Sequence, residues 1–117
     1  MKFAADGQLG PGIIIGDTNC ALTGLDEDTV YSADFNYRFV SPLLEHGWRD
    51  MFRVFYPRAD APTWYSTYGY GFRLDHAYVN TALQPYMKSC AHDWGQVWNG
   101  KRLSDHAAIL LDLNLPT

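Results

Sequence analysis

The stretch GIIIGDTNCALTG, residues 12–24, carries an apolar run straight into polar residues. Three isoleucines, Ile13 to Ile15, follow a Gly-Pro-Gly break, and this pattern is typical of a short, fully buried strand. Gly16, Asp17 and Asn19 come directly after it. They are either the ordinary residues of a turn or a site built at the end of a buried strand. The rest of the sequence has to distinguish the two interpretations.

Length and composition predict one globular domain, residues 1–117. The chain has 117 residues, of which 47% are hydrophobic and 15% aromatic, which is enough for a folded core. The net charge of −4 argues against simple electrostatic binding of nucleic acid, because such binding needs a basic surface. It leaves a metal site open, since a cation would offset local carboxylates.

Nothing in the sequence predicts a membrane segment or a disulfide framework. No apolar run approaches the roughly 18 residues of a transmembrane helix, and the first residues lack the apolar region of a signal peptide. The two cysteines, Cys20 and Cys90, are too few and too far apart for a disulfide scaffold. We therefore expect free thiols and a cytoplasmic protein.

The hydrophobic pattern predicts strands and one or two helices. Apolar residues at helical spacing between 35 and 44 indicate a helix, in which Ser41-Pro42 is either a kink or the start of a second short helix. Gly47 suits its C-terminal cap, and residues 20–29 are expected to form a loop. We expect a helical turn within 81–88 and strands at 13–15, 48–56, 62–66, 72–80, 89–98 and 107–113. The first strand, the helix and the strand at 48–56 should form a βαβ unit, with the others mostly antiparallel.

Polar side chains gather at three predicted strand ends. Asp17 and Asn19 follow the first strand, Asp75 lies inside the strand at 72–80, and Ser104-Asp105-His106 precedes the last strand. A carboxylate inside a strand needs a partner, because burying it alone is costly. His106 is the candidate, since an Asp–His pair fixes the imidazole tautomer and raises its pKa. Each signal by itself is more typical of a turn or of ordinary surface polarity than of a site.

Together, and in this order, four motifs resemble the endonuclease/exonuclease/phosphatase superfamily. The motifs are GIIIGDTN (12–19), GWRDMFR (47–53), PTWYS…GFRLDHAYVN (62–80) and LSDHAAILLDL (103–113). This group includes exonuclease III, the apurinic endonucleases, pancreatic deoxyribonuclease, the neutral sphingomyelinases and the inositol polyphosphate phosphatases. The resemblance covers residues 12–115, which is nearly the whole chain.

The resemblance implies a role for each polar residue. Asp17 would position or deprotonate the attacking water, and Asn19 would orient that Asp and the phosphate. His106 would donate a hydrogen bond to the phosphoryl oxygen, Asp75 would pair with His106, and Asp105 would contact metal or water. The implied metal is Mg²⁺ or Mn²⁺, with Asp17 and Asp105 as its ligands. Attack on a phosphodiester needs such a placed water, a cation and fixed donors.

The sequence departs from the family in length. The family domain is about twice as long, and this chain resembles its C-terminal half. The implied fold is α/β, half of a four-layer α/β/β/α sandwich, with one mixed, mostly antiparallel sheet of about six strands. The N-terminal half normally supplies an Asn, a Glu metal ligand and a Tyr or second His. Only 12 residues precede Ile13, and the acids at 26–28 follow the first motif, so we expect half an active site that binds Mg²⁺ weakly.

Two functions are compatible with these observations. The first is a divalent-metal-dependent phosphodiester hydrolase (nuclease or phosphatase) fragment that needs a complementing partner. The second is a catalytically inactive binding or assembly module. A half domain would expose an apolar sheet face, so we expect a homodimer. DNA, RNA, sphingomyelin and phosphoinositides are all cleaved with these motifs, and the substrate stays open.

The remaining histidines and aromatic residues have less specific interpretations. His46 and His92 are expected to be surface or turn residues, and His76 is expected to pack on the strand face opposite Asp75. Four aromatic residues could stack on bases or on a lipid headgroup, or could simply pack a loop: Tyr65, Tyr68, Tyr70 and Phe72.

Overall fold

The computed structural model describes residues 10–21 and 33–116, with the side chains of 33–37 left aside. Its elements in chain order are β1 (Ile13–Asp17), α2 (Ala33–Glu45), β2 (Arg49–Asp50), α3 (Met51–Phe55), β3 (Trp64–Tyr65), β4 (Gly71–Phe72), β5 (Asp75–Val79), a 3₁₀ turn (Gln84–Tyr86), β6 (Met87–Asp93) and β7 (Ala108–Leu113). Most of the loop expected at 20–29, including the acids at 26–28, lies outside the described residues. The α/β class expected from the sequence is confirmed.

Strand β5 is the centre of the fold. It lies between β1 and β2 and pairs antiparallel with both, so β1 and β2 run parallel to each other with β5 between them. The expected βαβ unit is therefore present but split by a third strand. The register sets Ile13 opposite Val79 and Asp17 opposite Asp75. The β1–β5 ladder thus brings two of the predicted site residues to one end of the sheet.

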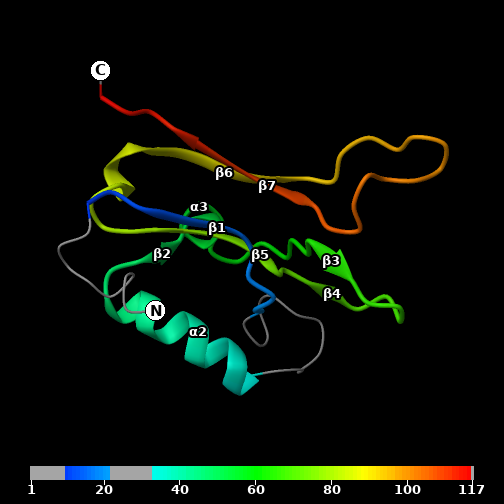
Figure 1. Ribbon diagram of the computed structural model, residues 1–117, viewed down its shortest axis with the longest axis horizontal. Helices are drawn as coiled ribbons and strands as arrows, with labels where there is room; N and C mark the ends of the chain where they lie inside the picture. Colours follow the sequence, from blue (N-terminus) through cyan, green and yellow to red (C-terminus); the bar gives the residue numbers. More distant parts are fainter. Residues whose placement is uncertain (1–9, 22–32, 117) are drawn as a thin grey trace.

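The predicted number of about six strands roughly fits, but the prediction that they form one sheet is wrong. The described residues contain seven strands in three small sheets, β1-β5-β2, β3-β4 and β6-β7. The strand expected at 72–80 is divided into β4 and β5, because the backbone N–H groups of Leu74 and Asp75 donate to the hydroxyl of Thr63 instead of a neighbouring strand. The strand expected at 89–98 ends at Asp93. The loop after it extends beyond the end of the sheet, beside the tip of the β3–β4 hairpin (Figure 1).

Helix α2 covers one face of the three-stranded sheet (Figure 1). Val40 and Leu43 of this helix pack with Trp48 and with Tyr78 of β5. The helix continues through Pro42 as one element. It ends in a Schellman motif, in which Gly47 has φ of +85° and the N–H of Trp48 donates to the carbonyl of Leu43 at 3.0 Å. The expected cap at Gly47 is confirmed.

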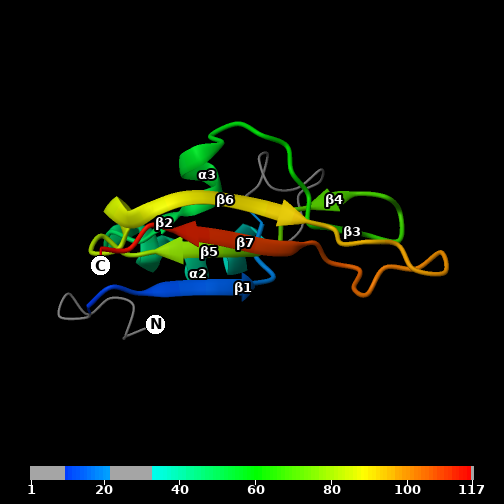
Figure 2. The ribbon, with the colours of Figure 1, turned by 90° about the horizontal axis from the view of Figure 1, so that it is seen from above.

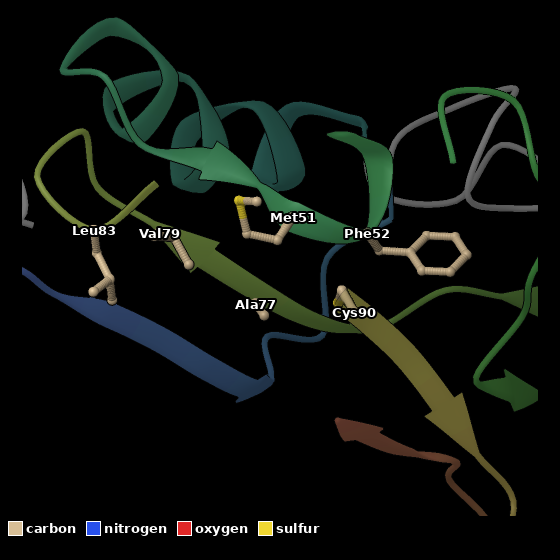
Figure 3. Packing of buried hydrophobic residues seen from close by; sticks show 6 residues of the cluster. All are labelled: Met51, Phe52, Ala77, Val79, Leu83 and Cys90. Atoms are coloured by element: carbon tan, nitrogen blue, oxygen red, sulfur yellow. The ribbon is translucent and has the colours of Figure 1, made fainter. Parts of the chain in front are cut away.

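The opposite face of the sheet is covered by α3 and the β6–β7 hairpin (Figures 1 and 2). Figure 3 shows this core, which joins Met51 and Phe52 of α3, Ala77 and Val79 of β5, and Cys90 of β6. Alternate side chains of β7 also pack against it. Strand β5 is therefore buried on both faces, although its sequence alternates. The hairpin supplies much of the cover that the sequence led us to expect from a second chain.

The strand expected at 48–56 is wrong. Only Arg49 and Asp50 are extended, and residues 51–55 form α3. The carboxylate of Asp50 caps this helix by accepting a hydrogen bond from the N–H of Arg53. The cap and the burial of Met51 and Phe52 outweigh the strand preference of an aromatic, β-branched run. Among the described residues, no helix is both long and apolar enough to cross a lipid bilayer.

Candidate functional site

The centre of the candidate site is a hydrogen bond between Asp75 and His106. Asp75 is the first residue of β5, and His106 lies just before β7. Nδ1 of His106 lies 2.8 Å from Oδ2 of Asp75. An ionised carboxylate only accepts hydrogen bonds, so the Nδ1–H group donates and the tautomer is fixed. Nε2 is then the nitrogen left to act on a ligand.

Asp17 lies on the open side of this pair. Its Oδ2 atom is 3.8 Å from Nε2 of His106. The side chains of Asp75, His106 and Asp17 are 8%, 25% and 51% exposed, so the three groups lead from the core to solvent. One ligand atom from each lies within 4.8 Å of the other two. The structure thus brings together three of the five residues selected from the sequence, and their catalytic roles remain predictions.

The electrostatics of the cluster favour a protonated His106. Partial burial by itself lowers the pKa of His106, because it disfavours the charged ring. The hydrogen bond to Asp75 and the charges of Asp75, Asp17 and Asp105 act in the opposite direction and outweigh it. The pKa of His106 is therefore raised above its ordinary value. The Nε2–H group of an imidazolium is a donor well suited to an anionic ligand.

Asn19 and Asp105 lie next to the cluster in the sequence, and their expected roles stay predictions. The backbone N–H of Asn19 donates to Oδ1 of Asp17 at 2.9 Å, and Asn19 adopts a φ of +53°. This Asx turn fixes the carboxylate of Asp17. The carboxylate of Asp105 accepts a hydrogen bond from Nε1 of Trp64 at 3.2 Å, so it is directed to the β3–β4 hairpin. It acts on His106 through its charge.

The donor set can hold a divalent cation only in part. Two carboxylates and an imidazole are usual ligands of such cations. Oδ2 of Asp75, however, accepts from the Nδ1–H of His106, and the raised pKa of His106 means that a proton competes more strongly with a cation for Nε2. Asp17 is then the most exposed carboxylate that the cluster offers to Mg²⁺ or Mn²⁺. One carboxylate with substrate phosphates is a familiar way to hold Mg²⁺, but a weak one without substrate.

A buried threonine holds the site together and was missed from the sequence. Thr63 is fully buried, and its Oγ1 accepts from the N–H of Leu74 and of Asp75 at 2.9 and 3.2 Å. Its carbonyl accepts from the N–H of Ala107 at 2.8 Å. The residue therefore ties the start of β5 to the residue after His106. A Thr between Pro62 and Trp64 gives no local signal of this role, because all its partners are remote in the sequence.

Thr18 was also missed, and it links the site to the core. Its hydroxyl donates to the carbonyl of Leu74 at 3.1 Å and lies 2.7 Å from Nδ1 of His76. His76 is buried and stacks on Tyr78 with ring centroids 5.6 Å apart. The expected packing role of His76 is confirmed. The turn after β1 is therefore anchored through Thr18 while Asp17 faces solvent.

The other histidines lie away from the site. His46 is exposed in the turn after α2, as expected, with Nδ1 2.8 Å from the carbonyl of Pro42. The expectation for His92 is wrong, since it is half-buried in β6 and stacks on Phe52 at 4.4 Å. Burial, followed by the charge of Arg73, lowers its pKa to about 4. His92 is therefore a neutral packing residue near pH 7.

The aromatic residues between the strands divide into two groups. Phe72 is buried and packs against Trp64 with centroids 5.7 Å apart, so it belongs to the core. The other three are exposed, and they are Tyr65, Tyr68 and Tyr70. Only these three remain candidates for stacking on a ligand.

Comparison with known proteins identifies solved structures of the same fold. No family model and no curated protein matches the chain. The 3′ phosphatase NExo from Neisseria bound to a product DNA hairpin matches 92% of this chain with a TM-score of 0.78 and 22% identity. The 3′-5′ exonuclease NExo from Neisseria meningitidis matches 92% of the chain with a TM-score of 0.74 and 23% identity. The AP endonuclease of Leishmania major matches 89% with a TM-score of 0.72 and 22% identity.

The chain spans less than half the length of these three structures, namely 47%, 47% and 35%. Likeness at this identity establishes the fold, and the activity has to be argued from the site. The fold predicted from the four motifs is confirmed, as is its partial character. The chain therefore has about half of the fold of these exonuclease, phosphatase and AP endonuclease structures.

Proposed function

We propose that the chain supplies one side of the active site of a divalent-metal-dependent phosphodiester hydrolase. The observation that carries the proposal is the Asp75–His106 hydrogen bond, with Nε2 of His106 facing Asp17. The neighbours of the same fold are named an exonuclease, a phosphatase bound to a DNA hairpin and an AP endonuclease. Their names favour nucleic acid as the phosphodiester.

The three side chains would divide the chemistry between them. Asp17, partly exposed and fixed by the Asn19 turn, would orient a water molecule and accept its proton as the water attacks phosphorus. The Nε2–H of His106 would donate to a phosphoryl oxygen as negative charge develops there. Asp75 would hold the imidazolium in place. A divalent cation held by Asp17 and the phosphate would neutralise the remaining charge. The proton for the leaving oxygen is expected from a complementing chain.

We further propose that this complement is a second copy of the chain. β1 is an edge strand of the described three-stranded sheet, and its Ile13 and Ile15 are 40% and 49% exposed. An apolar, unpaired edge favours pairing with another strand. A two-fold axis would let two β1 strands pair and bury these side chains, which is the simplest closed arrangement.

Sedimentation at micromolar concentration tests the dimer. We expect a dimer for the unmodified chain and a monomer for Ile15→Glu, which places a charge on the edge. Leu110→Glu, at a similarly exposed position on β7, is the control and should leave the dimer intact. A folded monomer of the unmodified chain would contradict the proposal, and a dimer that survives Ile15→Glu would move the interface elsewhere.

A cleavage assay tests the hydrolase. The purified chain is incubated with bis(4-nitrophenyl) phosphate and Mg²⁺ or Mn²⁺, and we expect slow, metal-dependent release of nitrophenol. Asp17→Ala and His106→Ala should abolish it, while Asp112→Ala and His46→Ala, exposed groups outside the cluster, should not. The alternative is an inactive binding or assembly module, which the partial coverage of the neighbours favours. No cleavage with any metal, in the monomer or the dimer, would support that alternative.

We propose a cytoplasmic location because of the two thiols. Cys20 and Cys90 are both buried and free. Burial raises the pKa of Cys90 to about 11, with a smaller contribution from the charge of Asp50. Free thiols are usual in reducing compartments. Labelling of the unfolded protein taken from its native cells should find both thiols free.

A further inference from the structure

A hollow that the site chemistry does not use lies beside Asp105. Its volume is about 530 Å³, and it lies between Tyr65 of β3 and the loop that joins β6 to β7. This volume is within the range of small-molecule binding sites. Asp105 is part of the wall of the hollow and directly precedes His106. A ligand in the hollow would therefore lie next to the hydrolytic cluster.

One wall of the hollow is a preformed aromatic platform. The rings of Tyr65 and Trp94 stack with centroids 5.9 Å apart and planes at 27°. The guanidinium of Arg102 lies over the ring of Trp94, 5.4 Å from its centroid. Tyr65 is 53% exposed, so a planar group can reach the platform. Flat aromatic surfaces of this kind stack on nucleobases with little preference for sequence.

The charge of the hollow is opposite to that of the whole chain. Its charged wall residues are Lys101, Arg102 and Asp105, so the cations outnumber the carboxylate. The chain as a whole carries −4. Lys101 is held in place by a tight turn, because its N–H and carbonyl both bond to Trp98, at 3.0 and 2.7 Å. Asn99 and Gly100, the central residues of this turn, both have positive φ. A local excess of cations beside an aromatic platform matches a phosphate next to a base.

We propose that this hollow binds single-stranded nucleic acid, with a base on the Tyr65–Trp94 platform and a neighbouring phosphate on Lys101 and Arg102. The inference deepens the proposed function and rests on it, since the bound strand would continue past Asp105 to His106. It names the substrate class as a strand with unpaired bases, because a base has to leave its stack to lie on the platform.

Fluorescence anisotropy of a labelled oligothymidylate tests the proposal. The measurement uses the full chain with EDTA present, so that binding is observed without cleavage. We expect Trp94→Ala to weaken binding by about 5- to 100-fold, as for the loss of one stacked base. Arg102→Gln should weaken binding and lower the slope of log K against log salt by about 0.7, as for one lost phosphate contact. Lys101→Gln should weaken binding and lower the salt slope as Arg102→Gln does. If circular dichroism shows that Trp94→Ala does not fold, these two variants still test the proposal.

Two matched variants control for non-specific effects. Trp98→Ala removes an exposed indole of the same loop that does not line the hollow, and Arg58→Gln removes an exposed cation of a distant turn. Both should bind within about twofold of the unmodified chain, since neither loses a stacked base or a specific phosphate contact. Equal losses in Trp94→Ala and Trp98→Ala would overturn the proposal, as would no binding of the oligonucleotide. Binding of anionic phospholipid vesicles in place of the oligonucleotide would also overturn it.

The test separates this inference from the proposed function. Asp17→Ala is expected to abolish cleavage and to keep the dependence of oligonucleotide binding on Trp94 and Arg102, because Asp17 is not part of the hollow. Binding that depends on Trp94 and Arg102 in a chain that cleaves nothing would support the hollow and contradict the hydrolase. Cleavage without Trp94-dependent binding would support the hydrolase and contradict the proposed binding of nucleic acid in the hollow.

Discussion

Two carboxylate–base pairs lie at the start of β5, and they differ in how they meet solvent. Arg73, two residues before Asp75, donates to both carboxylate oxygens of Asp50. Their side chains are only 1% and 10% exposed. In the Asp75–His106 pair, the side chain of Asp75 is buried to a similar degree. The imidazole of His106 is more exposed and lies next to the half-exposed Asp17. The first pair is closed on every side, and the second is open on one.

The difference explains why only one of the two pairs is a candidate for chemistry. A guanidinium stays charged at all relevant pH values, and that of Arg73 also lies 5.2 Å from the ring centre of Phe52. This pair joins β2 and the start of α3 to the segment between β4 and β5, and its role is structural. The imidazole of His106 can gain or lose a proton, and its Nε2 remains accessible. A buried pair fixes the fold, whereas a titratable pair with one open side can act on a ligand.

The largest effect should come from breaking the closed pair. Asp50→Ala removes the carboxylate that accepts two hydrogen bonds from the buried guanidinium of Arg73, and it also removes the cap of α3. We expect a loss of about 3–5 kcal/mol in the free energy of unfolding, because removing one partner of a buried pair leaves a charge in a poor environment. Urea unfolding followed by circular dichroism measures it.

The control is an exposed pair. Lys88 and Asp112 lie 3.9 Å apart, and both side chains are mostly exposed. Asp112→Ala should cost less than about 1 kcal/mol, since solvent screens such pairs. Equal losses in Asp50→Ala and Asp112→Ala would contradict the distinction between a closed pair and an exposed one.

The next largest effect should come from the threonine that holds the open pair in place. Thr63→Val keeps the shape of the side chain and removes the acceptor for the N–H groups of Leu74 and Asp75. We expect a loss of about 2–3 kcal/mol in stability, the lower end of the range for two buried N–H groups that each cost about 1–3 kcal/mol without an acceptor. Thr63→Ser, which keeps the hydroxyl, should lose less. A Thr63→Val protein as stable as Thr63→Ser would show that the hydroxyl is not needed.

The open pair should make stability depend on pH, because the imidazole of His106 titrates near neutral pH. Because the pKa of His106 is raised in the folded chain, its contribution is complete below the unfolded value of about 6.5. It is lost as pH rises through the folded pKa. The free energy of unfolding should therefore fall in this window in the unmodified chain, and fall less in Asp75→Asn. An NMR titration should also show a lower His106 pKa in Asp75→Asn, and an unchanged titration would contradict the pairing.

Much of the site could be predicted because its residues belong to recognisable motifs. The alternation in residues 72–80 correctly separated the faces of β5, since Ala77 and Val79 meet the hairpin while Tyr78 meets α2. The order of the motifs selected Asp17, Asp75 and His106, which the structure brings together. Local pattern and motif order were sufficient for Asp17 and Asp75, because the β1–β5 register sets these two residues opposite each other.

The failures have a common physical cause, which is a partner far away in the sequence. Residues 51–55 have the composition of a strand, but Asp50 pairs with the remote Arg73, and Met51 and Phe52 pack with remote residues of β5 and β6, which favours a helix there. The role of Thr63 depends on Leu74, Asp75 and Ala107. Neither the secondary-structure propensity of a segment nor the period of its hydrophobic pattern shows which remote residues it will contact. It becomes visible only when the elements are packed.

The smallest expected effect concerns metal at the open pair. Oδ2 of Asp75 is held by His106, so Asp17 is the most exposed carboxylate that the cluster offers to Mg²⁺. A site with a millimolar dissociation constant would raise the free energy of unfolding by only about 0.4 kcal/mol in 1 mM Mg²⁺, whereas a micromolar site would raise it by about 4 kcal/mol. We expect a change of less than about 1 kcal/mol in thermal or urea unfolding, and none in Asp17→Asn. A stabilisation near 4 kcal/mol would mean that other carboxylates complete the site. Asp26, Glu27 and Asp28, which lie outside the described residues, would then be the first to replace.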